Sequence, residues 1–83
     1  MLAAAVIQPG AIIGDAVIVN TGAIIEHDCT VGSGTHVASG AILSGGCSVG
    51  THCMIGAGAV VLHGAEVPNE TLVASLTRYP ARQ

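Results

Sequence analysis

The sequence contains no Phe, no Trp and no Lys, and its only aromatic residue is Tyr79. A layered globular core usually has large aromatic side chains at its centre, so we expect a narrow interior filled by Val, Ile, Leu and Ala. The only basic residues are Arg78 and Arg82, and the net charge is −3. Because nucleic-acid binding depends on clustered basic residues, this composition argues against a nucleic-acid partner.

The sequence also lacks long apolar runs and a clear targeting signal. No uninterrupted apolar stretch approaches the ~18 residues of a membrane span, so no membrane partner is expected. The opening MLAAAVI has no positively charged region and is followed by Gln8-Pro9-Gly10, unlike a signal peptide. We therefore expect a soluble, cytoplasmic protein. Its 83 residues allow one small domain, whose core would be marginal without oligomerisation.

A six-residue repeat organises the chain. Every sixth residue from Ile7 to Val73 is Ile, Val or Leu, and we call it residue one of a hexad. Residue five is small throughout, and residue four is Gly in seven hexads, as a turn with positive φ favours. Each hexad is predicted to be a short extended segment and a two-residue turn. Side chains five and one then point inward, and side chains six and two point outward.

A longer period of three hexads is marked by Gly14, Gly32 and Gly50. The two periods predict an all-β fold, a parallel β-solenoid of triangular cross-section with about four coils and rungs ~4.8 Å apart. We place this β-helix at residues 1–74 and a short C-terminal tail at residues 75–83. Cys29, Cys47 and Cys53 occupy residue five, so free structural thiols are favoured over a disulfide framework.

The outward side chains separate by face when the sequence is folded at three hexads per coil. Two faces are largely apolar, and the third is more polar and rich in glycine. The first apolar face carries a stripe formed by Val6, Ile24, Ile42 and Val60. Because two non-equivalent apolar faces on a three-sided rod can close a ring, we predict a homotrimer. The alternative is a monomer with a few exposed aliphatic side chains.

The segment AIIEHDCTVG, residues 23–32, contains three consecutive ionisable side chains, Glu26, His27 and Asp28. His27 and Asp28 fall in a turn, and Gly45 follows His27 by three hexads, which places it on the neighbouring coil. A glycine there opens its backbone N–H to any group that the histidine contacts. The plain alternative for these residues is a solvated cluster at a turn.

Two further polar residues, Asn20 and His36, fall on the second apolar face, across the triangle from this corner. They can share a site with His27 only if two chains meet there. A zinc enzyme on the same fold, the γ-type carbonic anhydrase, is disfavoured. His27 and His63 would lie ~9.6 Å apart, too far for one metal ion within a chain, so no metal is expected.

The uninterrupted hexads resemble the left-handed parallel β-helix of hexapeptide-repeat acyltransferases. The run VNTGAIIEHDCTVGSGTHVASGAILSGG, residues 19–46, is similar to the subgroup that acetylates amino sugars and sialic acids with acetyl-CoA. Left-handedness is implied by the resemblance alone, because β-crossovers are normally right-handed.

The resemblance also implies roles for individual residues. His27 corresponds to the general base, Asp28 to the acid that orients it, and Gly45 to the backbone N–H donor facing the thioester carbonyl. Asn20 and His36 correspond to polar residues contributed by the adjoining subunit of a trimer. Such a site transfers acetyl from the co-substrate acetyl-CoA directly to a small acceptor, by O- or N-acetylation and without a covalent enzyme intermediate.

Two departures from the subgroup bear on this expectation. Its members usually carry an N-terminal α/β subdomain, whereas these residues begin almost at the first coil, so a separate protein would supply sugar binding. The usual GVPAR-like loop near CoA corresponds here to ASLTRYPAR, residues 74–82. Both departures favour the alternative function, a non-catalytic trimeric β-helix module.

Overall fold

The structure, a computed structural model, describes residues 5–81. Residues 1–4 of the predicted β-helix and residues 82–83 of the predicted tail lie outside the described residues. The described chain forms thirteen strands of two residues each. They are β1 (Val6–Ile7), β2 (Ile12–Ile13), β3 (Ile18–Val19), β4 (Ile24–Ile25), β5 (Thr30–Val31), β6 (His36–Val37), β7 (Ile42–Leu43), β8 (Ser48–Val49), β9 (Met54–Ile55), β10 (Val60–Val61), β11 (Glu66–Val67), β12 (Leu72–Val73) and β13 (Arg78–Tyr79).

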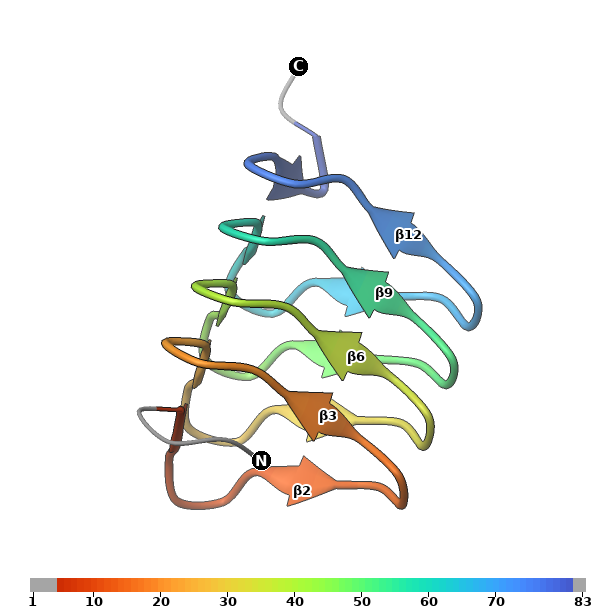
Figure 1. Cartoon of the computed structure of the whole chain (residues 1–83). Helices are drawn as coiled ribbons and strands as arrows, with labels where there is room; N and C mark the ends of the chain where they lie inside the picture. The colour runs from red at the N-terminus through yellow and green to blue at the C-terminus, as the bar shows by residue number, and fades with distance from the viewer. Residues whose placement is uncertain (1–4, 82–83) are drawn as a thin grey trace.

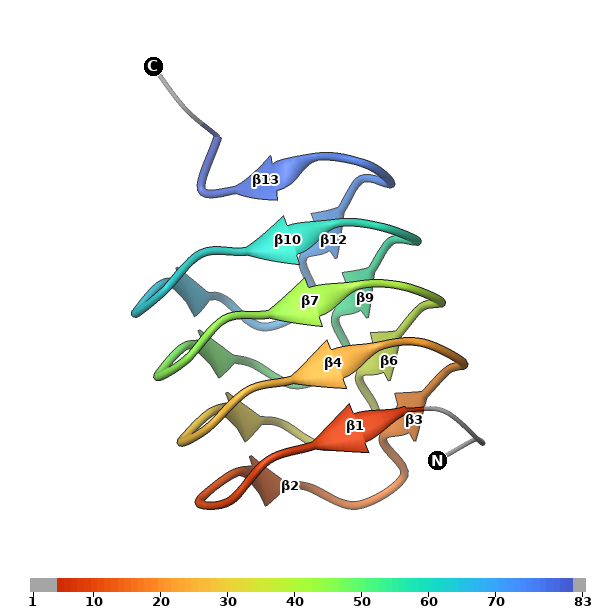
Figure 2. The same ribbon diagram turned by 90° about the vertical axis from the view of Figure 1, so that its left-hand side faces the viewer.

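The strands form three parallel ladders, which are the three faces of a prism (Figures 1 and 2). Sheet A contains β1, β4, β7, β10 and β13, sheet B contains β2, β5, β8 and β11, and sheet C contains β3, β6, β9 and β12. Each strand pairs with the strand three hexads further on, as in the pairing of Ile24 with Ile42. The described part of the chain holds no helix long and apolar enough to cross a membrane. The predicted all-β solenoid of about four coils is confirmed.

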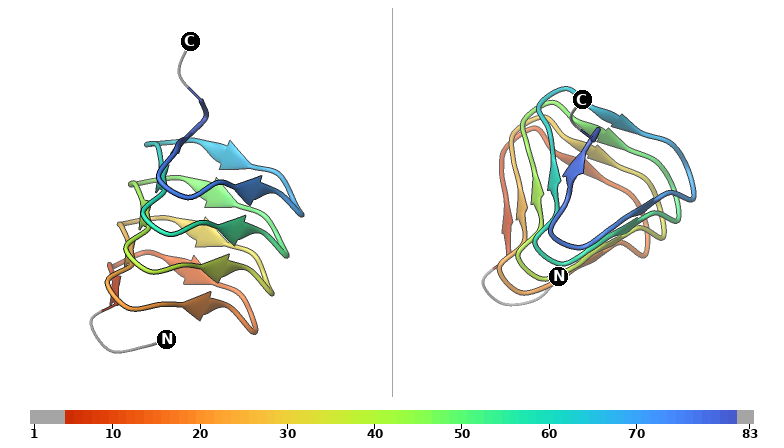
Figure 3. Two further views of the ribbon diagram at one scale, coloured as in Figure 1. Left: turned by 45° about the horizontal axis from the view of Figure 1, so that its top comes forward. Right: turned by 90° about the horizontal axis from the view of Figure 1, so that it is seen from above.

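The solenoid is left-handed. Seen from above, the chain rises clockwise toward the viewer around a triangle (Figure 3). The usual right-handed rule describes a crossover segment that packs back onto its own sheet. Here each crossover consists of strands of the other two sheets, which face the sheet across the core. The hand implied by the resemblance is therefore observed.

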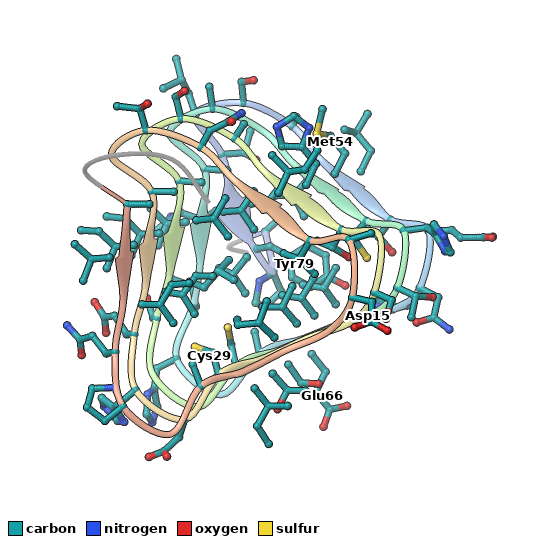
Figure 4. All side chains as sticks on the ribbon, turned by 60° about the horizontal axis from the view of Figure 1, so that its bottom comes forward. Asp15, Cys29, Met54, Glu66 and Tyr79 are labelled. Carbon is teal, nitrogen blue, oxygen red and sulfur yellow. The ribbon has the colours of Figure 1, made fainter. Side chains whose placement is uncertain are left out.

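Residues one and five of the hexads fill the interior of the prism. Ile25, Leu43 and Ile55 at residue one are fully buried, as is Thr35 at residue five. Figure 4 shows Cys29 and Tyr79 inside the triangle and Glu66 outside it. No large aromatic layer is needed, because aliphatic side chains from three sheets fill this narrow space.

The backbone conformation at the corners of the prism explains why residue four is so often glycine. Every residue four from Gly10 to Leu76 has positive φ, between 52° and 81°. Seven of these are glycines, which reach this region without steric cost. The other five are Ala16, Asp28, His52, Glu70 and Leu76. The stacked coils impose the corner conformation even on residues that do not favour it.

The ladder extends into the segment that is predicted to be a C-terminal tail. In sheet A, β13 pairs with β10 and places Tyr79 beside Val61. Thr77 and Tyr79 continue residues five and one of the hexad, but the aromatic ring replaces the aliphatic side chain that marks earlier hexads. Tyr79 is half-buried against the end of the core.

The outward apolar faces differ in exposure. Within the stripe on sheet A only Val6, at 45%, is exposed, and its other members are half-buried. The side chains of the stripe stack in register one rung apart, with Val6 at the lower end. Sheet C is more open, since Ile18 is 49% and Leu72 is 71% exposed.

Candidate functional site

The predicted catalytic residues lie at the corner between sheets A and B. Strand β4 ends at Ile25 and β5 begins at Thr30, so His27 and Asp28 are residues three and four of their hexad. Asp28 has φ 61°, a left-handed conformation that Asp adopts more readily than most residues. The two side chains are 58% and 71% exposed, and both are therefore accessible to a small molecule.

Asp28 orients the imidazole of His27. Nδ1 of His27 lies 3.2 Å from Oδ2 of Asp28. A carboxylate at this distance favours the tautomer with the proton on Nδ1, so that Nε2 carries the free lone pair. The Asp28 carboxylate occupies the space in which a side chain at Gly10, one coil below, would stand.

His27 lies directly against Gly45 on the next coil. A Cβ at Gly45 would stand 2.6 Å from Nε2 and 2.8 Å from Cε1 of His27, so only glycine leaves room for the ring. Gly45 itself is buried. The structure thus brings together the three residues that the three-hexad period places at this corner.

Glu26, for which the sequence predicts no role, also belongs to this site. The Gly45 N–H donates a hydrogen bond to Oε1 of Glu26 at 3.2 Å. At each corner from Asp28 onward, the N–H of residue four bonds the carbonyl of residue three on the coil below, as Gly46 bonds His27 at 3.0 Å. The N–H of residue three has no part in this pattern, and at Gly45 it bonds residue two of the coil below. The bond therefore depends on corner geometry, and the six-residue pattern carries no signal for it.

Asn20 and His36 form a separate pair on sheet C. Nδ2 of Asn20 donates to Nε2 of His36 at 2.6 Å, which leaves the imidazole proton on Nδ1. Both residues are half-buried. Within one chain they lie on a different side of the prism from His27, and the structure does not bring them to it.

The remaining histidines and the cysteines contribute little to this corner. His63 occupies the same corner two coils above His27, with Cε1 3.9 Å from the Cβ position of Gly46. Within residues 5–81, no three side chains of His, Cys, Asp or Glu lie close enough to hold one metal ion.

The three cysteines are free and buried, as the sequence predicts. Sγ of Cys47 lies 3.5 Å from Sγ of Cys29 on the neighbouring rung. Burial and the adjacent Cys29 raise the pKa of Cys47 from 9.0 to about 12. A thiol with so high a pKa is a poor nucleophile at neutral pH.

Comparison with known proteins agrees with the repeat. Residues 28–63, within the described solenoid, match the family model described as bacterial transferase hexapeptide (six repeats). No curated protein matches the chain. Together, the repeat match and the triangular β-solenoid fit an acyltransferase-like scaffold of the hexapeptide-repeat β-helix type.

Proposed function

We propose that the chain is an acetyltransferase that moves an acetyl group from acetyl-CoA directly to a small acceptor such as an amino sugar. The observation that carries the proposal is the His27 imidazole, which lies on the Gly45 backbone and is held by Asp28 at 3.2 Å. This places a base with a free lone pair beside a backbone donor that the solenoid positions independently.

Each group has a defined part in the proposed reaction. Nε2 of His27 takes the proton from the acceptor amine or hydroxyl as that group attacks the thioester carbonyl, which typically contributes ~10²–10⁴ in rate. Asp28 stabilises the imidazolium that forms. The Gly45 N–H donates to the tetrahedral oxyanion, which typically contributes another ~10²–10³. The intermediate then expels the CoA thiolate, which takes the proton back from His27.

The proposed active form is a homotrimer with sites between subunits. Sheets A and C carry the two apolar outer faces, and Leu72 on sheet C is 71% exposed. Contact between such faces would bring the Asn20–His36 pair of one subunit toward the His27 corner of another. That pair would then contact the acceptor, and a separate protein would assist with larger sugars.

Acetyl-CoA binding is the direct test. In a thermal-shift experiment, a ligand present at 100 times its dissociation constant stabilises the protein by ~2.7 kcal/mol. We expect such a shift with acetyl-CoA, together with weak acetyl transfer to small amino sugars. Loss of transfer in His27→Ala with binding retained would support the assigned role of the base.

A second candidate function is a non-catalytic trimeric β-helix module. It is favoured by the internal pairing of the site groups, because the Gly45 N–H bonds Glu26 at 3.2 Å and Asn20 bonds His36 at 2.6 Å. A trimer that shows neither a shift with acetyl-CoA nor acetyl transfer would establish this module in place of the enzyme.

A further inference from the structure

The Glu26 carboxylate accepts a hydrogen bond from the Gly45 N–H, the backbone donor that the proposed reaction needs. Its Oε1 accepts the Gly45 N–H at 3.2 Å, where the thioester carbonyl oxygen would have to bind. Glu26 is half-buried and Gly45 is buried, so this bond is partly shielded from water. The Nε2 atom of His27 lies against the same glycine, so the carboxylate and the proposed base both contact Gly45.

This contact differs from those at the other corners. The residue-three N–H of Thr51 donates to Oδ1 of Asn69 at 2.8 Å, and that of Asp15 donates to Oγ of Ser33 at 3.2 Å. In both, a neutral side chain of the coil above caps the donor. At Gly45 the cap is a carboxylate from the coil below. A bond to an ionised acceptor is stronger than one to a neutral carbonyl, so Glu26 competes effectively with a thioester.

We infer that Glu26 is a gate: its carboxylate holds the Gly45 N–H in the free protein and swings away when an acyl thioester binds. This inference rests on the proposed function, because it assigns the gated donor to the acyl group. Free CoA has no carbonyl at this point and does not need the gate to open. Glu26 therefore lowers affinity for acyl-CoA specifically, and positions the donor without reacting.

The test compares acetyl-CoA with free CoA by isothermal titration calorimetry on the full chain. Glu26→Ala should bind acetyl-CoA about 10-fold more tightly than wild type, since a charge-assisted bond no longer has to break. For free CoA, the affinity change caused by Glu26→Ala should differ by less than about two-fold from the change caused by the control variant. The control is Glu66→Ala, which removes the same charge from an exposed position on sheet B and corrects for the general attraction of anionic CoA.

A second measurement follows the Gly45 amide in the NMR spectrum without any ligand. Its proton signal should move upfield in Glu26→Ala and stay in place in Glu66→Ala. An unmoved signal would overturn the gate. Equal affinity changes for acetyl-CoA and free CoA would also overturn it while leaving the proposed function intact. If neither wild type nor Glu26→Ala binds acetyl-CoA, both the gate and the proposed function fail.

Discussion

The imidazole of His27 fills the space that a side chain at Gly45 would occupy, with Nε2 2.6 Å from the Cβ position. One residue lies at a corner of one coil and the other lies three hexads further on, at the same corner of the next. Their contact depends on the register in which neighbouring coils stack, so a change at either residue probes both the site and the stacking of the solenoid.

Gly45→Ala should displace the ring with little effect on folding. Gly45 is the glycine at residue three and has no positive φ, so alanine fits its backbone conformation, and only the exposed imidazole has to move. We expect the melting temperature to change by a few degrees at most and acetyl transfer to fall ~10²-fold. In a His27→Ala background the same substitution should have no further effect on the rate. If the two substitutions lower the rate additively, Gly45 does not act through its contact with His27.

The two histidines at this corner provide a matched comparison. His27→Ala should lower acetyl transfer by ~10² or more, whereas His63→Ala should leave the rate within a few-fold. Asp28→Asn should give an intermediate rate, because Asn tolerates the left-handed φ of 61° but lacks the charge that stabilises an imidazolium. Similar, small effects of both histidine substitutions would identify a solvated turn and rule out the acyltransferase assignment.

Assembly should depend on sheets A and C and not on sheet B. Ile42→Lys and Leu72→Lys should each place a charge in every interface of the proposed trimer and yield monomers in light scattering. Ile12→Lys on sheet B changes a side chain that is also highly exposed, at 66%, and should leave the assembly intact. Circular dichroism checks that each variant keeps its fold. A wild-type monomer at micromolar concentration would contradict the prediction.

Cys47 should make stability depend on alkaline pH. Its pKa rises from 9.0 to about 12 on folding, so the folded state favours the protonated thiol. The corresponding stabilisation is complete below pH 9 and is lost as the pH rises toward about 12. The urea midpoint should therefore fall more between about pH 8 and about pH 10 in wild type than in Cys47→Ala. Parallel curves for the two proteins would show that Cys47 does not titrate in this way.

Leu76 offers a stabilising substitution. It has φ 60° and is 84% exposed, so it bears the cost of the corner conformation without burying its side chain. Leu76→Gly should raise the free energy of unfolding by ~0.5–1 kcal/mol. Glycine removes the left-handed penalty of ~1–2 kcal/mol, but part of this gain is offset because the unfolded chain becomes more flexible. Gly58→Ala, one coil below at φ 68°, should destabilise instead. Thermal unfolding of both variants checks the signs.

Much of the fold could be predicted because one physical rule repeats. Residue one faces inward in every coil, and a period of three hexads fixes which residues stack, so the contact of His27 with Gly45 follows from sequence spacing. Tyr79 shows the limit of that rule, since an aromatic side chain at residue one hides a hexad that the backbone still forms.

The role of Glu26 could not be predicted for a different reason. Its bond to Gly45 depends on which corner N–H groups lack a backbone partner and on how far a side chain at residue two reaches toward the next rung. Those are properties of corner geometry and rotamers, and a pattern of residue types contains neither. The Asn20–His36 bond is similar, because spacing places the two residues on one sheet but does not show that they satisfy each other.

The stacking of coils has a consequence for local opening. Each coil contacts only its neighbours, so amide hydrogen exchange is expected to be fastest at the two ends of the stack. The core residue Ile7 in the lowest described coil is 37% exposed, whereas Ile25 and Leu43 are fully buried. His27 comes two residues after Ile25, and Gly45 comes two residues after Leu43. The outer rungs can therefore open locally while the spacing between His27 and Gly45 is preserved.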